Sequence, residues 1–177
     1  MDKFSEIMLT LGLYFFLFLL PIFLYLKLKS KVNPLTYLKL NNKPLKGITI
    51  GVFLSITYII ILTIRNYILG EKSVSWNIGV LWFSIITVGF LEEIPFRGFI
   101  LQNLESKISF WTANILTTLL FVVMHYSTWI SSNDFFSCFS IAFMSLLFGY
   151  IYKESDSLWV PIICHSVYNM TIWVGMK

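Results

Sequence analysis

Three ionisable side chains lie inside one of the longest apolar stretches of the chain, in the segment Glu92-Glu93-Ile94-Pro95-Phe96-Arg97. Bringing a charged side chain to membrane depth costs about 2.5–3.5 kcal/mol even on the scales that give the smallest penalties. The two histidines of the chain, His125 and His165, also lie in apolar segments. Carboxylates and imidazoles are common proton-transfer groups, so these residues are candidates for a functional site.

The spacing within the acidic segment separates its two carboxylates. Glu93 and Arg97 are four residues apart on a helix, in the order that favours an ion pair, and such a pair needs no catalytic part. Glu92 points about 100° away from Glu93 and is left free. Pro95 removes one backbone donor and strains the helix around Leu91, which predicts a kink beside the carboxylates.

The second histidine belongs to a different arrangement. His165 and Asn169 are four residues apart, so a helix presents an imidazole and a carboxamide on one face. Two hydrogen-bond donors directed at one point can stabilise a developing oxyanion. The alternative for Asn169 is a polar contact between membrane helices. His125 follows Phe121 by four residues, which places ring and imidazole on one face.

The same side chains are also a candidate zinc site. A divalent metal such as zinc would lower the pKa of a bound water, with Glu92, His125 and His165 as its ligands. However, the sequence has no His-Glu-x-x-His motif, and adjacent glutamates do not project to one point from a regular helix. Metal-free and metal-assisted chemistry therefore both stay open.

The composition determines the setting of these residues. Hydrophobic residues make up 57% of the chain and charged residues 12%, whereas soluble domains carry about 25% charged residues. This predicts an integral membrane protein. The 177 residues have room for about six membrane-spanning helices and for no separate soluble domain of typical size. The predicted fold is all-α: a multi-pass transmembrane helical bundle with a catalytic cavity within the membrane.

Six apolar runs follow one another along the chain. We read residues 1–177 as a single membrane domain, with the motif-bearing core at about 76–170. The first run has an acidic flank and no small-residue cleavage site, so we expect a retained helix and not a signal peptide. The expected spans are residues 7–26, 48–69, 76–104, 110–130, 135–151 and 158–176.

The loop of residues 27–46 predicts the orientation in the cell membrane. It holds six lysines and no acidic residue, which places it in the cytoplasm by the positive-inside rule. In a chain this apolar, a membrane anchor is a better explanation than a nucleic-acid patch. Alternation of the six spans then puts both termini outside.

A hairpin of the third and fourth spans brings two of the candidate residues together. Glu92 is 16 residues before Ile108, the centre of the turn, and His125 is 17 residues after it. Each then lies about 25 Å from the turn. We therefore expect Glu92 and His125 to face each other at one level of the membrane.

Three motifs in this order carry a family resemblance. Glu92-Glu93-x-x-x-Arg97, Phe121-x-x-x-His125 and His165-x-x-x-Asn169 resemble the signature motifs of the CAAX protease and bacteriocin-processing family of intramembrane endopeptidases, also called the Abi family. The resemblance covers roughly residues 76–170. It implies hydrolysis of a peptide bond in a membrane-associated peptide or protein, by a water activated inside the bilayer.

The resemblance also assigns expected roles. Glu92 would be the general base, and His125 would help to orient and polarise the water. His165 and Asn169 would form the oxyanion pair, while Glu93 and Arg97 would support the site. The short chain resembles bacterial members linked to peptide maturation or bacteriocin self-immunity more than it resembles prenyl-protein processing enzymes.

Two other classes of function compete with the endopeptidase. A non-catalytic, protease-like scaffold or immunity protein would bind a bacteriocin peptide without cleaving it. A small transporter would use the intramembrane carboxylates as a proton relay. Neither an internal repeat nor paired broken helices supports the transporter.

Overall fold

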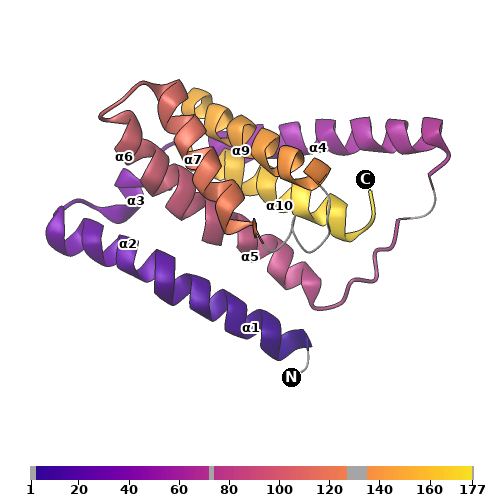
Figure 1. Cartoon of the computed structure of the whole chain (residues 1–177), viewed down its shortest axis with the longest axis horizontal. Helices are drawn as coiled ribbons and strands as arrows, with labels where there is room; N and C mark the ends of the chain where they lie inside the picture. Colours follow the sequence, from indigo (N-terminus) through magenta and orange to yellow (C-terminus); the bar gives the residue numbers. More distant parts are fainter. Residues whose placement is uncertain (1–2, 72–73, 127–134, 177) are drawn as a thin grey trace.

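The computed structural model describes residues 3–71, 74–126 and 135–176, and every regular element in them is a helix. Figure 1 shows their arrangement. In chain order the elements, with η for π-helical segments, are α1 (Lys3–Tyr14), η1 (Phe15–Leu19), α2 (Leu20–Leu24), η2 (Tyr25–Lys29), α3 (Pro34–Tyr37), α4 (Pro44–Leu69), α5 (Leu81–Glu93), η3 (Ile94–Leu101), α6 (Gln102–Glu105), α7 (Phe110–Met124), α9 (Phe135–Ser155) and α10 (Trp159–Trp173).

These elements form six long helices within the described residues. Elements α1 to η2 run on without a break, as do α5, η3 and α6, and α4, α7, α9 and α10 are single helices. Three helices are long and apolar enough to cross a membrane: Phe4–Lys29, Pro44–Leu69 and Phe136–Ser155. The predicted all-α, multi-pass membrane bundle of about six helices is therefore confirmed.

The expected start of the third span is wrong. Residues 74–80 are not helical, and α5 begins at Leu81 instead of Trp76. Gly79 has a φ of +56°, a left-handed conformation that interrupts a right-handed helix. The segment is held instead by a hydrogen bond from the Ser75 amide to the Val174 carbonyl.

The other expected boundaries are mostly close to the observed ones. The first and second helices extend beyond the predicted residues 7–26 and 48–69, and α9 continues to Ser155. The last helix ends at Trp173 and not at 176, because Gly175 has a φ of +86°. The expected end of the fourth span at Ile130 lies outside the described residues.

Helix α10 is the central packing element for the site. It packs mainly against α4 and α5, and α7 packs against α9. The approach of α5 to α10 depends on Gly89, where a Cβ atom would lie 2.6 Å from the Ile162 carbonyl oxygen. This close contact brings the end of α5 next to the middle of α10.

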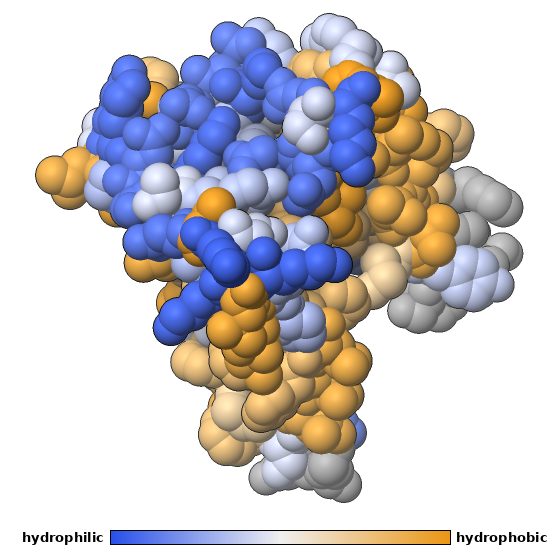
Figure 2. All heavy atoms as spheres, turned by 90° about the vertical axis from the view of Figure 1, so that its left-hand side faces the viewer, coloured by the Kyte–Doolittle hydropathy of each residue, from blue (hydrophilic) through white to orange (hydrophobic). Residues whose placement is uncertain are grey.

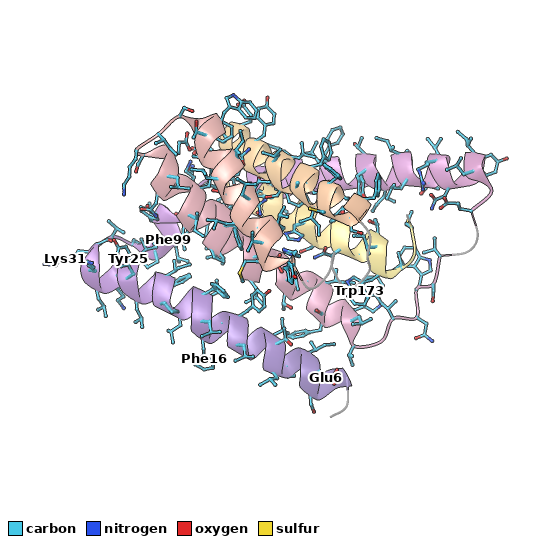
Figure 3. The ribbon with its side chains drawn as sticks, in the orientation of Figure 1. Glu6, Phe16, Tyr25, Lys31, Phe99 and Trp173 are labelled. Carbon is cyan, nitrogen blue, oxygen red and sulfur yellow. The ribbon has the colours of Figure 1, made fainter. Side chains whose placement is uncertain are left out.

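The first helix lies along one side of the bundle, against α5 and η3 (Figure 1). The ring centroids of Tyr25 and Phe99 are 5.7 Å apart in an edge-on contact, visible at the end of this helix in Figure 3. Phe16 points away from the bundle in the same view and is 64% exposed, as expected for a side chain in contact with lipid. One face of the first helix is therefore packed and the other is free for the bilayer.

Hydrophilic residues gather at one end of the molecule, shown in Figure 2, above apolar flanks. This end carries α3, α6 and the loops beside them. Lys39 pairs with Asp156 at 2.6 Å, and Lys153 pairs with Glu105. That this end is cytoplasmic, with both termini outside, stays a prediction from the lysines.

Candidate active site

Three side chains from separate helices meet in the interior. Glu92 lies in the last turn of α5, His125 is the C-cap residue of α7, and His165 lies in the middle of α10. Oε2 of Glu92 is 3.5 Å from Nε2 of His125 and 3.8 Å from Nε2 of His165. The prediction that Glu92 and His125 face each other across the hairpin is confirmed.

The orientation of His125 follows from its place at the end of α7. Its backbone has left the helical conformation, with φ −93° and ψ 15°. Its Nδ1 atom lies 2.8 Å from the carbonyl oxygen of Phe121. Because a carbonyl oxygen only accepts hydrogen bonds, Nδ1 carries the proton and Nε2 faces Glu92.

His165 connects the two adjacent glutamates. Its Nδ1 lies 2.6 Å from Oε1 of Glu93, and its Nε2 is the atom 3.8 Å from Glu92. Neighbouring glutamates on a helix diverge, as expected, but one imidazole ring is wide enough to reach both. Glu93, expected to support the site together with Arg97, also orients a residue of α10.

The predicted ion pair between Glu93 and Arg97 is confirmed. Nη1 of Arg97 donates to Oε1 of Glu93 at 2.9 Å, and both side chains are fully buried. Nη2 of Arg97 donates to the carbonyl oxygen and to Oγ of Ser145 in α9, each at 2.8 Å. The guanidinium also lies over the Phe121 ring, 4.9 Å from its centroid. Arg97 thus ties α5, α7 and α9 together around the carboxylates.

The irregularity predicted at Pro95 is a π-helical segment. Residues Ile94–Leu101 form eight π-helical residues with Pro95 in the first turn. A proline cannot donate the backbone hydrogen bond of a regular helix, and widened turns of this kind often occur at functional sites. The wider turn follows directly after Glu93.

A cavity of about 630 Å³ adjoins the histidines. His125, His165 and Asn169 all line it, so the predicted imidazole and carboxamide do face one space. None of the described residues that line it is Asp, Glu, Lys or Arg. The other lining residues are apolar, aromatic or hydroxyl-bearing, among them Tyr58, Ser140, Tyr168 and Trp173.

A much smaller pocket of about 10 Å³ lies between the first helix and the Glu92–His125 pair. Its volume suits about one water molecule. Besides Glu92 and His125, it is lined by Tyr14 and by four apolar residues, Phe18, Pro95, Phe96 and Met124.

The zinc alternative concerns the same three side chains, Glu92, His125 and His165. Within the described part of the chain, no group of three or more His, Cys, Asp or Glu side chains is arranged to hold an ion. Glu93, the extra carboxylate, is engaged by both Arg97 and His165. No step below uses a metal, and the zinc alternative stays a separate prediction to test.

Sequence reasoning missed the partners that hold these groups in place. Ser145 binds Arg97, and the Phe148 ring stacks on His165 with centroids 5.2 Å apart. Neither residue has a sequence spacing to the motif residues that would predict the contact, because both lie on α9, a separate helix that packs against the site. Only the three-dimensional arrangement identifies them.

The sequence matches the model of one protein family. Residues 74–171, more than half of the chain, match the family model described as Type II CAAX prenyl endopeptidase Rce1-like. The chain belongs to this family, which confirms the resemblance inferred from the three motifs.

One curated relative is the protein named "Putative membrane peptidase YdiL" of Bacillus subtilis (strain 168), which is 29% identical over 79 residues. The aligned part is 45% of this chain and 30% of that protein, so the match spans less than a third of the relative's length. No solved structure matches the chain.

Proposed function

We propose that this protein is an intramembrane endopeptidase that hydrolyses a peptide bond in a membrane-associated peptide or protein. The observation that carries the proposal is the position of the Glu92 carboxylate. Its Oε2 atom is buried, has no hydrogen-bond partner among the described residues, and faces Nε2 of both histidines. A buried carboxylate oxygen without a partner is costly, and Glu92, unlike Glu93, is not paired with Arg97, which supports a chemical role for Glu92.

In the proposed reaction, Glu92 removes a proton from a water molecule while Nε2 of His125 orients that water. The hydroxide oxygen adds to the carbonyl carbon of the scissile bond, and the carbonyl oxygen becomes an oxyanion. When the tetrahedral intermediate collapses, the C–N bond breaks and the leaving amine takes the proton from Glu92. The products are a carboxylic acid and an amine, and Glu92 is again ionised.

His165 and Asn169 are the proposed oxyanion donors. Both line the cavity from the same face of α10. His165 already donates Nδ1–H to Glu93, so in its doubly protonated form it donates Nε2–H toward the cavity. The Asn169 side chain has no hydrogen bond to any described residue and can donate its amide to the same oxygen. In an interior of low dielectric, such donors stabilise developing charge more strongly than in water.

Glu93 and Arg97 have a supporting role in this proposal. Glu93 fixes the proton on Nδ1 of His165, in the way a buried carboxylate orients a catalytic histidine. Arg97 neutralises Glu93 and attaches it to α9 through Ser145. In this proposal Glu92 is therefore the base, and Glu93 orients His165.

The cavity lining supports an apolar substrate segment. Because none of its described lining residues is Asp, Glu, Lys or Arg, it suits a membrane-embedded stretch of peptide or a lipid-modified one. The family description names a prenyl endopeptidase, so a prenylated CAAX peptide is the first substrate to test. Peptide maturation and bacteriocin self-immunity are the physiological roles we propose to examine next.

The test uses the full chain in liposomes with two internally quenched peptides, one ending in a prenylated CAAX motif and one identical but unmodified. Wild-type protein should cleave at least one peptide, and Glu92→Gln should not. Glu105→Gln, which removes a carboxylate at the polar end, is the matched control and should cleave normally. Retained cleavage in Glu92→Gln would overturn the mechanism, and peptide binding without cleavage by the wild type would favour the non-catalytic scaffold.

A further inference from the structure

The two hollows beside the proposed site share α5 and α7 but differ in their other elements. The first helix and η3 complete the small pocket, whereas α4, α9 and α10 complete the large cavity. His125 lines both, and Glu92 lines only the small one. The carboxylate proposed as the base therefore faces a space with room for about one water, which shares His125 with the space that has room for a peptide.

The arrangement of Nε2 of His125 and Oε2 of Glu92 in the small pocket favours a bound water between them. Nδ1–H of His125 is donated to the Phe121 carbonyl, so Nε2 of the neutral ring is an acceptor. Oε2 of Glu92 is also an acceptor and lies 3.5 Å away. Two acceptors cannot bond to each other, but a water between them donates one hydrogen to each.

Tyr14 is the remaining polar side chain among the described residues that line this pocket. It is half-buried, and its ring packs on Phe18 at 5.6 Å between centroids. A water that donates to Glu92 and His125 has two lone pairs left. One can accept the Tyr14 O–H, and the other is then directed to an incoming carbonyl carbon.

We infer that the small pocket holds the nucleophilic water, and that Tyr14 of the first helix binds this water together with Glu92 and His125. The inference rests on the proposed function and adds a residue to it. Tyr14 lies outside the segment matched by the family model, so a helix without any signature motif completes the site.

The first experiment compares Tyr14→Phe with wild type in the liposome assay, with the quenched peptides above. The variant keeps the ring and removes one hydrogen bond, so kcat should fall about three- to tenfold while KM and the thermal unfolding temperature stay the same. Tyr25→Phe removes a hydroxyl from the same helix near its far end and should leave both constants unchanged. An unchanged kcat, or an effect on KM alone, would overturn the assignment of Tyr14.

Failure of this inference is distinguishable from failure of the proposed function. If Glu92→Gln is inactive but Tyr14→Phe has the wild-type kcat, only the role of Tyr14 is wrong. If Glu92→Gln still cleaves, or the wild type cleaves neither peptide, the proposed function itself fails. A structure that resolves ordered water tests the occupancy of the small pocket independently of activity. A water bound to Glu92, His125 and Tyr14 supports the inference, and a pocket without water overturns it.

Discussion

Nδ1 of His165 lies 2.6 Å from Oε1 of Glu93, and this hydrogen bond determines which nitrogen of the histidine can act. With Nδ1 directed at Glu93, Nε2 faces Glu92 and the cavity. Because Glu93 is held by Arg97, the orientation of an α10 residue depends on a salt bridge within the adjoining helix. Substitutions at the two neighbouring glutamates should therefore have different effects.

Glu92→Gln should affect cleavage alone, whereas Glu93→Gln should also affect stability. Among the described residues Glu92 has no ion pair with a lysine or arginine, so Glu92→Gln should lower the cleavage rate by at least about 100-fold with little change in unfolding temperature. Glu93→Gln leaves Arg97 buried without its counter-charge and should also destabilise the fold, by about 3–5 kcal/mol. Activity and thermal unfolding of both variants in detergent check this. Equal destabilisation by the two substitutions would contradict the division of roles.

The Arg97→Lys variant should be less stable and less active than the wild type, because lysine cannot replace the guanidinium. Arg97 uses separate nitrogens for Glu93 and for Ser145, and a single ammonium group cannot reach both in the same planar geometry. We expect a loss of about 1–3 kcal/mol in unfolding free energy and reduced cleavage. Arg65→Lys is the control, because Arg65 pairs with Glu71 at 3.4 Å on the surface and should show no effect. A fully stable Arg97→Lys protein would show that the Ser145 contact is dispensable.

Local spacing was sufficient to predict part of the site. A separation of four residues on a helix identified the Glu93–Arg97 pair and placed His165 and Asn169 on one face, because the 3.6-residue period is a local property. Counting from the turn placed Glu92 opposite His125. The predicted chemical roles of these residues still await the experiments above.

The contacts between helices could not be read from the sequence. The Glu93–His165 hydrogen bond joins residues 72 positions apart, and its formation depends on how closely α5 approaches α10. That distance depends on Gly89, which has no pattern of its own in the sequence. The start of α5 was also missed, because the left-handed conformation of Gly79 overrides an apolar run that otherwise favours a helix.

Gly89→Ala tests the close contact directly. The added methyl group would meet the Ile162 carbonyl oxygen at 2.6 Å and also the Ser166 hydroxyl, so α5 and α10 must move apart. We expect about 1–3 kcal/mol of destabilisation and a loss of cleavage, as the glutamates separate from His165. At Gly12 an added Cβ would meet nothing within 4 Å, so Gly12→Ala should be neutral or slightly stabilising. Unfolding temperature and cleavage rate of the two variants are compared in the same liposomes.

Chelation tests the metal alternative. The described His, Cys, Asp and Glu side chains form no group of three or more that is arranged to hold an ion. We therefore expect 1,10-phenanthroline to leave the cleavage rate unchanged, and elemental analysis of the purified protein to find less than one bound metal per chain. Loss of activity that is restored by added zinc would instead assign Glu92, His125 and His165 as ligands.

The polar end of the molecule should show a small acid-sensitive contribution to stability. The Asp156 carboxylate accepts a hydrogen bond from Nζ of Lys39, which holds the pKa of Asp156 below its usual range. A pKa lowered by folding stabilises the protein above the unfolded value of about 3.9, and this contribution is lost as the pH falls below about 4. Asp156 has a φ of 52°, which asparagine also tolerates, so Asp156→Asn removes the charge without straining the backbone. Because the Asp156 side chain is 52% exposed, we expect a loss of at most about 1 kcal/mol at pH 7 and a smaller loss near pH 3. Unfolding of wild type and variant at the two pH values measures this, and a difference as large at pH 3 as at pH 7 would assign the effect to something other than the ion pair.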